Sequence, residues 1–185
     1  MAKLYPGIDA DMAAWIAAQP MFFVASAPLA ADGHVNCSPR GLDTLRVLGP
    51  HEVAWLDLTG SGNETAAHLA ENGRITLMFC AFSGRPRILR LFGRGEVLLP
   101  GSEGFRNLRP LFPADLPGVR QLVRVDVTRI QTSCGFGVPH MRLEGQRTEL
   151  TEWALRKGED GLVGYRAERN ARSIDGLNAP GHADD

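Results

Sequence analysis

The chain has 185 residues, of which 44% are hydrophobic and 22% charged, and this composition is ordinary for one globular domain covering residues 1–185. The formal net charge of -1 provides no overall field that would attract nucleic acid or an anionic membrane. The three cysteines, Cys37, Cys80 and Cys134, form no CxxC pair and have no histidine at zinc-ligand spacing. We therefore expect no metal site and a reducing compartment.

The N-terminus contains no long apolar region of the kind found in signal peptides, and no stretch is long enough to span a bilayer. A cytoplasmic location is the expectation that follows. Of the 20 basic residues, 18 are arginine, which we interpret mainly as a compositional bias.

The first part of the chain predicts a short helix and then several strands. The helix covers Asp9 to Gln19, with Met12, Trp15 and Ile16 on one apolar face, and Pro20 ends it. Short apolar or alternating runs separated by turn residues predict the strands Met21–Ala25, His34–Ser38, Leu42–Leu48 and Glu52–Leu58.

The middle of the chain changes character after the fourth of these strands. Thr59–Gly62 is a flexible loop, Asn63–Asn72 has a helical pattern, and Gly73 stops the helix. Two further strands follow, Arg74–Cys80 and Arg87–Leu99. The second contains Gly93 and Gly95, and glycines inside a strand mark bends that let a sheet curl.

The last third of the chain contains one more strand and a helical extension. Ser102–Leu108 predicts a short helix, Pro110–Pro117 a loop and Gly118–Thr132 a long alternating strand. Polar, helix-compatible sequence then runs from Thr148 through Lys157 to about Asn170 and ends in a soft, poorly ordered tail. About six strands with one inserted helix predict a mainly β protein: a small barrel over about 20–135 and a helical extension over 136–185.

The segment Thr59–Thr65, TGSGNET, is the strongest local candidate for a binding site. Its glycines let the backbone approach a ligand, and a helix N-terminus offers free N–H groups to a phosphate. The segment lacks the GxxxxGK[ST] pattern of a nucleotide-binding P-loop. The alternative is an ordinary helix cap in which Ser61 or Asn63 is the capping residue.

Several other side chains are weaker candidates. Arg40 in NCSPRG follows a strand break and is placed to reach a ligand, or it is an ordinary surface arginine. Arg85 and Arg87 share one face of their predicted strand, whereas Arg90 and Arg94 share the other, so the four form no single basic patch. We expect Cys37 and Cys80 to be small buried side chains.

The segment Ser133–His140, SCGFGVPH, holds an aromatic residue between two glycines. Phe136 is therefore expected either to lie against a flat ligand ring or to plug one end of the barrel. Cys134 and His140 suggest a nucleophile and a base, but no third group is evident to orient them. Trp153 is expected to cover a pocket or to anchor the core, and Arg172 either to reach a partner's site or to lie on an exposed tail.

Taken together, these motifs resemble an uncharacterised branch of the pyridoxamine 5′-phosphate oxidase-related, FMN-binding split-barrel family. The resemblance covers nearly the whole chain. The residues that carry it are MFFVA (21–25), VNCSPRG (35–41), VAWLDLTGSGNETAAHL (53–69), NGRITLMFCAF (72–82), RILRLFGRGE (87–96), TSCGFGVP (132–139) and NARSIDGL (170–177).

The resemblance implies a six-stranded split barrel, with an inserted helix and C-terminal helices, that works as a homodimer and binds FMN at the dimer interface. It further implies that FMN is contacted by Ser38, Arg40, Gly41, Ser61, Gly62, Asn63, Thr65 and Arg87. The oxidases have Arg-Lys where this chain has Asn63-Glu64, and Glu64 cannot neutralise a phosphate. Pyridoxamine phosphate is therefore not the expected substrate.

The expected function is hydride transfer between a small organic substrate, or NAD(P)H, and an acceptor. In such a reaction the chemistry belongs to the flavin, and no catalytic acid or base is required of the protein. The alternative is a protein of the same fold that binds a flavin, deazaflavin F420 or haem without turnover.

Overall fold

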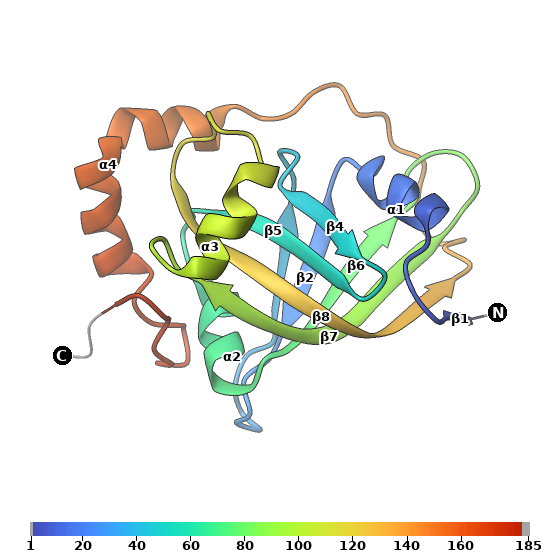
Figure 1. Cartoon of the computed structure of the whole chain (residues 1–185), viewed down its shortest axis with the longest axis horizontal. Helices are drawn as coiled ribbons and strands as arrows, with labels where there is room; N and C mark the ends of the chain where they lie inside the picture. The colour runs from blue at the N-terminus through green and yellow to red at the C-terminus, as the bar shows by residue number, and fades with distance from the viewer. Residues whose placement is uncertain (1, 183–185) are drawn as a thin grey trace.

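The computed structural model describes residues 2–182, which form one antiparallel sheet surrounded by four α-helices (Figure 1). The strand order is β3-β2-β6-β7-β8-β5-β4, and β1 pairs with β8 outside this path. The strands are β1 (Lys3–Tyr5), β2 (Phe22–Ser26), β3 (Asn36–Arg40), β4 (Leu45–Gly49), β5 (Glu52–Leu58), β6 (Arg74–Cys80), β7 (Ile88–Leu98) and β8 (Val119–Ser133). The helices are α1 (Ala10–Ala17), α2 (Glu64–Asn72), α3 (Glu103–Leu108) and α4 (Glu149–Arg169), with a 3-10 turn at Arg109–Leu111.

The sheet has eight strands in this part of the chain, where the sequence predicted about six; seven of the eight correspond to the strand segments named above. The three-residue strand β1 was not predicted, because Lys3–Tyr5 is too short to show an alternating pattern. Strand β4 begins at Leu45 and not at Leu42, because Leu42 and Asp43 have positive φ angles of 62° and 54°, which turn the backbone out of the extended conformation. The mainly β architecture itself is the predicted one.

The sheet curls where the glycines of β7 predicted it. The register between β7 and β8 shifts between Phe92 and Gly93. A Cβ atom on Gly93 would lie 2.1 Å from the carbonyl oxygen of Asp126, so no larger residue fits at this close approach. The bulge bends the two longest strands, which cross the molecule diagonally in Figure 1.

Alternating side chains from the strands fill the interior of the curled sheet. Val24, Trp55, Leu77 and Leu91 are completely buried in the main hydrophobic cluster. Helix α1 adds its apolar face, including Met12, to the same cluster. This arrangement is the barrel-like core that the alternating pattern predicted.

Helix α2 is inserted between β5 and β6, as predicted. It ends at Gly73, whose φ of 70° allows its N–H to bond to the carbonyl of Leu69. Its alanines Ala66 and Ala67 are buried against Ala179 near the other end of the chain.

The C-terminal region is more ordered than the soft tail that the sequence predicted. Helix α4 contains a kink at Gly158, where φ is 66° and ψ is 170°. Residues 170–180, called here the C-terminal strap, turn back toward α2. Within the strap, the N–H of Ser173 bonds to the carbonyl of Leu177 at 2.9 Å, and Ala179 is only 2% exposed. The expectation of a soft tail was wrong for these residues, because contacts with α2, distant in sequence, order them.

Candidate functional site

Strand β3 presents three polar side chains on one face. Asn36, Ser38 and Arg40 alternate along the strand and are half-buried, whereas Cys37 and Pro39 are exposed on the opposite face. Because β3 is an edge strand, its opposite face has little cover, and the prediction that Cys37 is buried was wrong. Cys80, on the inner strand β6, is buried as predicted.

Hydrogen bonds join this face of β3 to the first turn of α2. The Ser38 hydroxyl donates to Asn36 Oδ1 at 2.8 Å, and Asn36 Nδ2 donates to Thr65 Oγ1 at 3.0 Å. Asn36 thus links two predicted site residues, Ser38 and Thr65, that are far apart in sequence.

A buried carboxylate, Asp57 at the end of β5, joins Arg40 to β8. Asp57 Oδ1 lies 3.3 Å from Arg40 Nη2, and Asp57 Oδ2 accepts from Arg120 Nη2 at 2.7 Å and from Gln121 Nε2 at 2.8 Å. Burial by itself would raise the pKa of Asp57, but the charges of Arg120 and Arg40 outweigh burial and hold the pKa below its ordinary value of 3.8. Asp57 is therefore ionised at neutral pH.

The same network includes the start of α2. Asn63 is the N-cap residue, yet its side chain makes no capping bond, and its Oδ1 accepts from Gln121 Nε2 at 3.0 Å. The simple capping role considered from the sequence is therefore not what the Asn63 side chain performs. Arg120 Nη1 also donates to the carbonyl of Gly62 at 2.9 Å. The loop after β5 is thus fixed by the inner strand β8.

The C-terminal strap packs against one side of this loop. Asn170 Oδ1 accepts from Arg120 at 2.8 Å, and Asn170 Nδ2 donates to the carbonyl of Gly60 at 3.1 Å. Glu64 Oε2 accepts from the N–H of Ile174 at 3.1 Å, so its charge is directed to the strap. The other side of the loop is open, because Ser61 is exposed and no heavy atom lies within 4 Å of where a Cβ on Gly60 would be.

Two of the predicted residues lie apart from this group. Gly41 lines a cavity of about 960 Å³ between α1, β4 and residues 141–146. Arg87 places its guanidinium carbon 4.6 Å from the centre of the Trp15 ring, and Trp15 lines the same cavity. In residues 2–182 no hydrogen bond or ion pair joins Arg87 to the Ser61–Thr65 loop. The structure therefore joins Ser38, Arg40, Gly62, Asn63 and Thr65, but places Gly41 and Arg87 at the neighbouring cavity.

The SCGFGVPH segment forms an exposed turn. Gly135 has a φ of 70°, and Phe136 is 81% exposed, so Phe136 does not plug the barrel. Its other predicted role, against a flat ligand ring, stays a prediction. Cys134 and His140 are both exposed. Hydrogen bonds from backbone N–H groups, that of Phe136 foremost, lower the pKa of Cys134.

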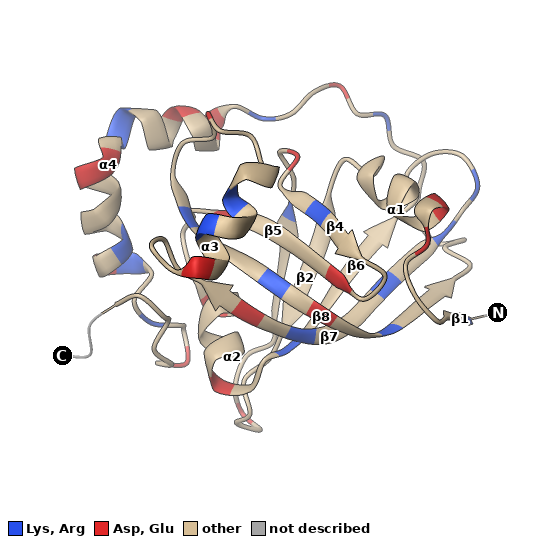
Figure 2. Ribbon diagram, in the orientation of Figure 1, with Lys and Arg blue, Asp and Glu red and all other residues tan. Residues whose placement is uncertain are grey.

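The remaining candidates lie outside the polar network. Trp153 packs edge-on against Tyr165 within α4, with ring centres 4.9 Å apart. Arg172 is exposed on the strap. Arg85 precedes β7, while Arg90 and Arg94 lie on that strand, so these arginines form no common patch. In Figure 2, acidic and basic positions are likewise interspersed along the strands and helices.

Four central members of the network could not be recognised as site residues from the sequence pattern: Asp57, Arg120, Gln121 and Asn170. A signal for the first three was present, because Asp57 lies between two leucines of its strand and the pair Arg120-Gln121 lies between a valine and a leucine. Such residues, when buried, need hydrogen-bonding or charged partners. The sequence gives no indication of which partners these are, because all of them lie on other elements.

A curled antiparallel sheet with a helix inserted after β5, and a polar site where that helix begins, defines a small β-barrel protein of the split-barrel class. Residues 8–134 match the family model of pyridoxamine 5′-phosphate oxidase. The chain is 38% identical over 197 residues to the pyridoxamine 5′-phosphate oxidase family protein ustO of Aspergillus flavus, covering 96% of this chain and 77% of ustO. The chain belongs to the pyridoxamine 5′-phosphate oxidase family.

Solved structures of distant relatives share the fold. A variant of HupZ from Group A Streptococcus superposes with a TM-score of 0.57 at 20% identity, covering 68% of this chain and 99% of HupZ. A candidate pyridoxamine 5′-phosphate oxidase from Lactobacillus delbrueckii gives a TM-score of 0.52 at 14% identity, covering 69% of this chain and 98% of that protein. These similarities confirm the predicted fold class. None of the helices in residues 2–182 is long and apolar enough to cross a membrane.

Proposed function

We propose that the protein is an FMN-dependent oxidoreductase that transfers a hydride to or from a small organic substrate. The observation that carries this proposal is the assembly of Ser38 and Arg40 from β3 with Asn63 and Thr65 from α2 at one polar site. Membership of the pyridoxamine 5′-phosphate oxidase family supports a flavin as the cofactor. A bound flavin would supply the hydride chemistry, and the chain supplies the binding site.

The open side of the loop fits a phosphate. The N-terminal N–H groups of α2 receive no side-chain cap from Asn63, and Ser61 is exposed beside them. Arg40 offers a guanidinium whose Nε is buried and has no hydrogen-bond partner among the described residues. Glu64, which stands where the oxidases have a lysine, accepts a hydrogen bond from the strap. This bond holds its charge in a fixed position.

The 960 Å³ cavity is the space that we assign to the substrate. Its walls include the apolar side chains of Trp15, Phe22, Phe79 and Leu143. A cavity with such walls and a few polar groups suits a small, mainly apolar molecule. Gly41 joins this cavity directly to Arg40 of the polar site.

We further propose that two copies associate through the outer face of the sheet. Phe23, Met78 and Phe92 alternate with core residues on β2, β6 and β7 and are only half-buried. Phe23 is paired in register with Met78 on the neighbouring strand, so their side chains form a continuous apolar surface. A homodimer would remove this surface from water.

The dimer proposal is tested by sedimentation of Met78→Asp. We expect the wild type to sediment as a dimer and Met78→Asp as a folded monomer. Leu155→Asp, at an exposed position on α4, is the matched control and should leave the wild-type state unchanged. A wild type that sediments as a monomer at micromolar concentrations would contradict the proposal.

The flavin proposal is tested by the absorption spectrum and by FMN titration. The purified protein should be yellow, or should quench the fluorescence of added FMN. Ser61→Glu places a negative charge where we assign the phosphate, and it should weaken FMN binding at least tenfold. Thr128→Glu adds the same charge at an exposed position on β8 and should have no effect. A colourless protein that takes up no FMN would refute the proposal.

The electron donor is tested separately. Anaerobic bleaching of the bound flavin by NADH or NADPH would support the oxidoreductase. A flavin that no donor reduces would favour the alternative of a binding protein without turnover. A deazaflavin or haem spectrum would contradict FMN as the cofactor, but it would still support the polar site as a cofactor-binding site.

A further inference from the structure

A second cavity, of about 870 Å³, lies on the side of the molecule away from α1. It is lined by residues of α3 and the following turn, the start of β8, α4, and residues 180–182. Figure 1 shows α3 and α4 toward the same end of the molecule, opposite α1, with the C-terminal strap below α4. The cavity shares no lining residue with the 960 Å³ cavity, and Arg120 connects it to the polar site at α2.

The charges that line this cavity are mostly positive. Arg109, Arg120 and Arg166 all line it, against one carboxylate, Glu159. Glu159 pairs with Arg166 at 2.7 Å, and the charge of Arg120 is met by a buried partner outside the cavity, Asp57.

Among the arginines that line this cavity, Arg109 has no counter-charge within the described residues. Its Nη1 and Nη2 donate to the carbonyl oxygens of Phe112 and Ala114, at 3.3 and 3.1 Å, and it has no carboxylate partner in residues 2–182. The two carbonyl bonds hold the guanidinium in place but leave its charge unbalanced. The positive environment also acts on His182, whose pKa is lowered by burial and further by Arg120 and Arg166.

The other walls of the cavity are apolar. Phe105 on α3, Leu116 in the following loop and Val163 on α4 all line it. Val163 is 55% exposed although it is a large apolar residue on a helix with a mostly polar surface. A fixed cation surrounded by apolar walls matches a ligand with one anionic end and an apolar body.

We propose that this cavity binds a small organic anion, such as a carboxylate with an apolar ring or chain, with the anionic end at Arg109 and the apolar body between Phe105 and Val163. The site is distinct from the one proposed for the flavin, because none of the residues assigned to the flavin lines it. It is a second ligand site of this chain.

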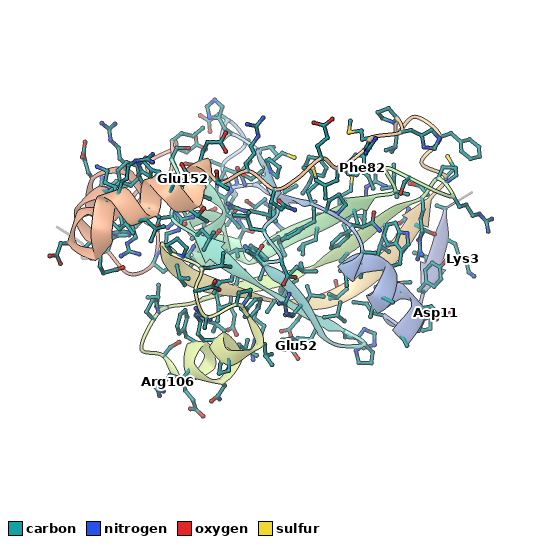
Figure 3. All side chains as sticks on the ribbon, turned by 90° about the horizontal axis from the view of Figure 1, so that it is seen from above. Lys3, Asp11, Glu52, Phe82, Arg106 and Glu152 are labelled. Atoms are coloured by element: carbon teal, nitrogen blue, oxygen red, sulfur yellow. The ribbon has the colours of Figure 1, made fainter. Side chains whose placement is uncertain are left out.

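Calorimetric titration with 4-phenylbutyrate tests the proposal, with the uncharged 4-phenylbutanamide as the matched ligand. The carboxylate should bind at least tenfold more tightly than the amide. Arg109→Gln should abolish this difference by weakening binding of the carboxylate alone. Arg106→Gln is the control, because Arg106, labelled in Figure 3, is an exposed residue of α3 that donates to the carbonyl of Gly101 and does not line the cavity.

A second variant keeps the test decisive if Arg109→Gln fails to fold. Val163→Trp replaces an exposed side chain by one that fills the cavity, and it should weaken both ligands at least tenfold. The proposal is overturned if 4-phenylbutyrate does not bind at millimolar concentration, if the amide binds equally well, or if folded Val163→Trp binds as the wild type does. None of these outcomes depends on the flavin, whose binding is read from the visible spectrum.

Discussion

Replacing Asp57 by asparagine is expected to destabilise the protein strongly while preserving its shape. Asp57 is 3% exposed, and it faces two guanidiniums, that of Arg120 at 4% exposure and that of Arg40 at 24%. Removing one partner of a buried ion pair costs roughly 3–5 kcal/mol, because the remaining charge stays buried. Arg40 can turn toward water, so we expect the lower end of this range, about 3 kcal/mol. For a chain of this length that loss lowers Tm by about 6–12 °C.

The assay is urea unfolding of wild type and Asp57→Asn, with Asp126→Asn as the control on an exposed position of β8. The control should change the free energy of unfolding by less than about 0.5 kcal/mol. A loss for Asp57→Asn that is no larger than the control's would refute the reasoning, because it would mean that the carboxylate does not stabilise the two arginines.

The stabilisation that Asp57 provides depends on pH, and the direction of this dependence follows from its pKa. The pKa of Asp57 is lower in the folded state than its ordinary value of 3.8. The stabilisation by Asp57 is therefore fully present above pH 3.8 and is lost as the pH falls through the lower pKa of the folded state. The difference between wild type and Asp57→Asn should shrink over that acidic range. A difference that grows as the pH falls would contradict the sign.

Two further predictions concern the bend in the sheet and the strap. Gly93→Ala should destabilise the protein by several kcal/mol, since its Cβ would meet a backbone carbonyl at 2.1 Å, whereas Gly60→Ala should be nearly neutral in the same unfolding assay. The hydrogen bond and charge of Asp175 raise the pKa of His34, and Asp175 Oδ1 lies 2.7 Å from His34 Nδ1. In Asp175→Asn, NMR titration should find the pKa of His34 back near 6.5; an unchanged pKa would show that the contact is not formed. The stabilisation by this contact should be full below pH 6.5 and be lost as the pH rises through the raised pKa.

The local sequence was sufficient wherever local preference decides the structure. The alternation in Glu52–Leu58 predicted a strand with the observed bounds, and the glycines of β7 predicted a bend that the register shift after Phe92 confirms. The helix after β5 was predicted to end at Asn72, and it does. In each case the information lies within a few residues, as periodicity or as a residue that only one backbone conformation accepts.

The sequence was insufficient where a residue's partner is distant. Arg40 was recognised as a candidate, but its contact with Asp57 depends on how the edge strand β3 packs beside β5. Arg87 was grouped with the phosphate contacts, yet it lies over Trp15 at the neighbouring cavity. Residues of one chemical type look equivalent in a sequence, and only their position in the fold separates their environments.

A curled, mainly β fold with an inserted helix could be predicted from the sequence, because backbone preference and hydrophobic alternation act over short distances. Only the three-dimensional structure shows that the strap covers one side of the start of α2, that Asp57 joins Arg40 to Arg120, and that Arg109 lies in a cavity without a carboxylate partner among residues 2–182. The physical reason is that burial and electrostatic interaction depend on distance in space, and the residues involved are separated along the chain by as many as 110 positions.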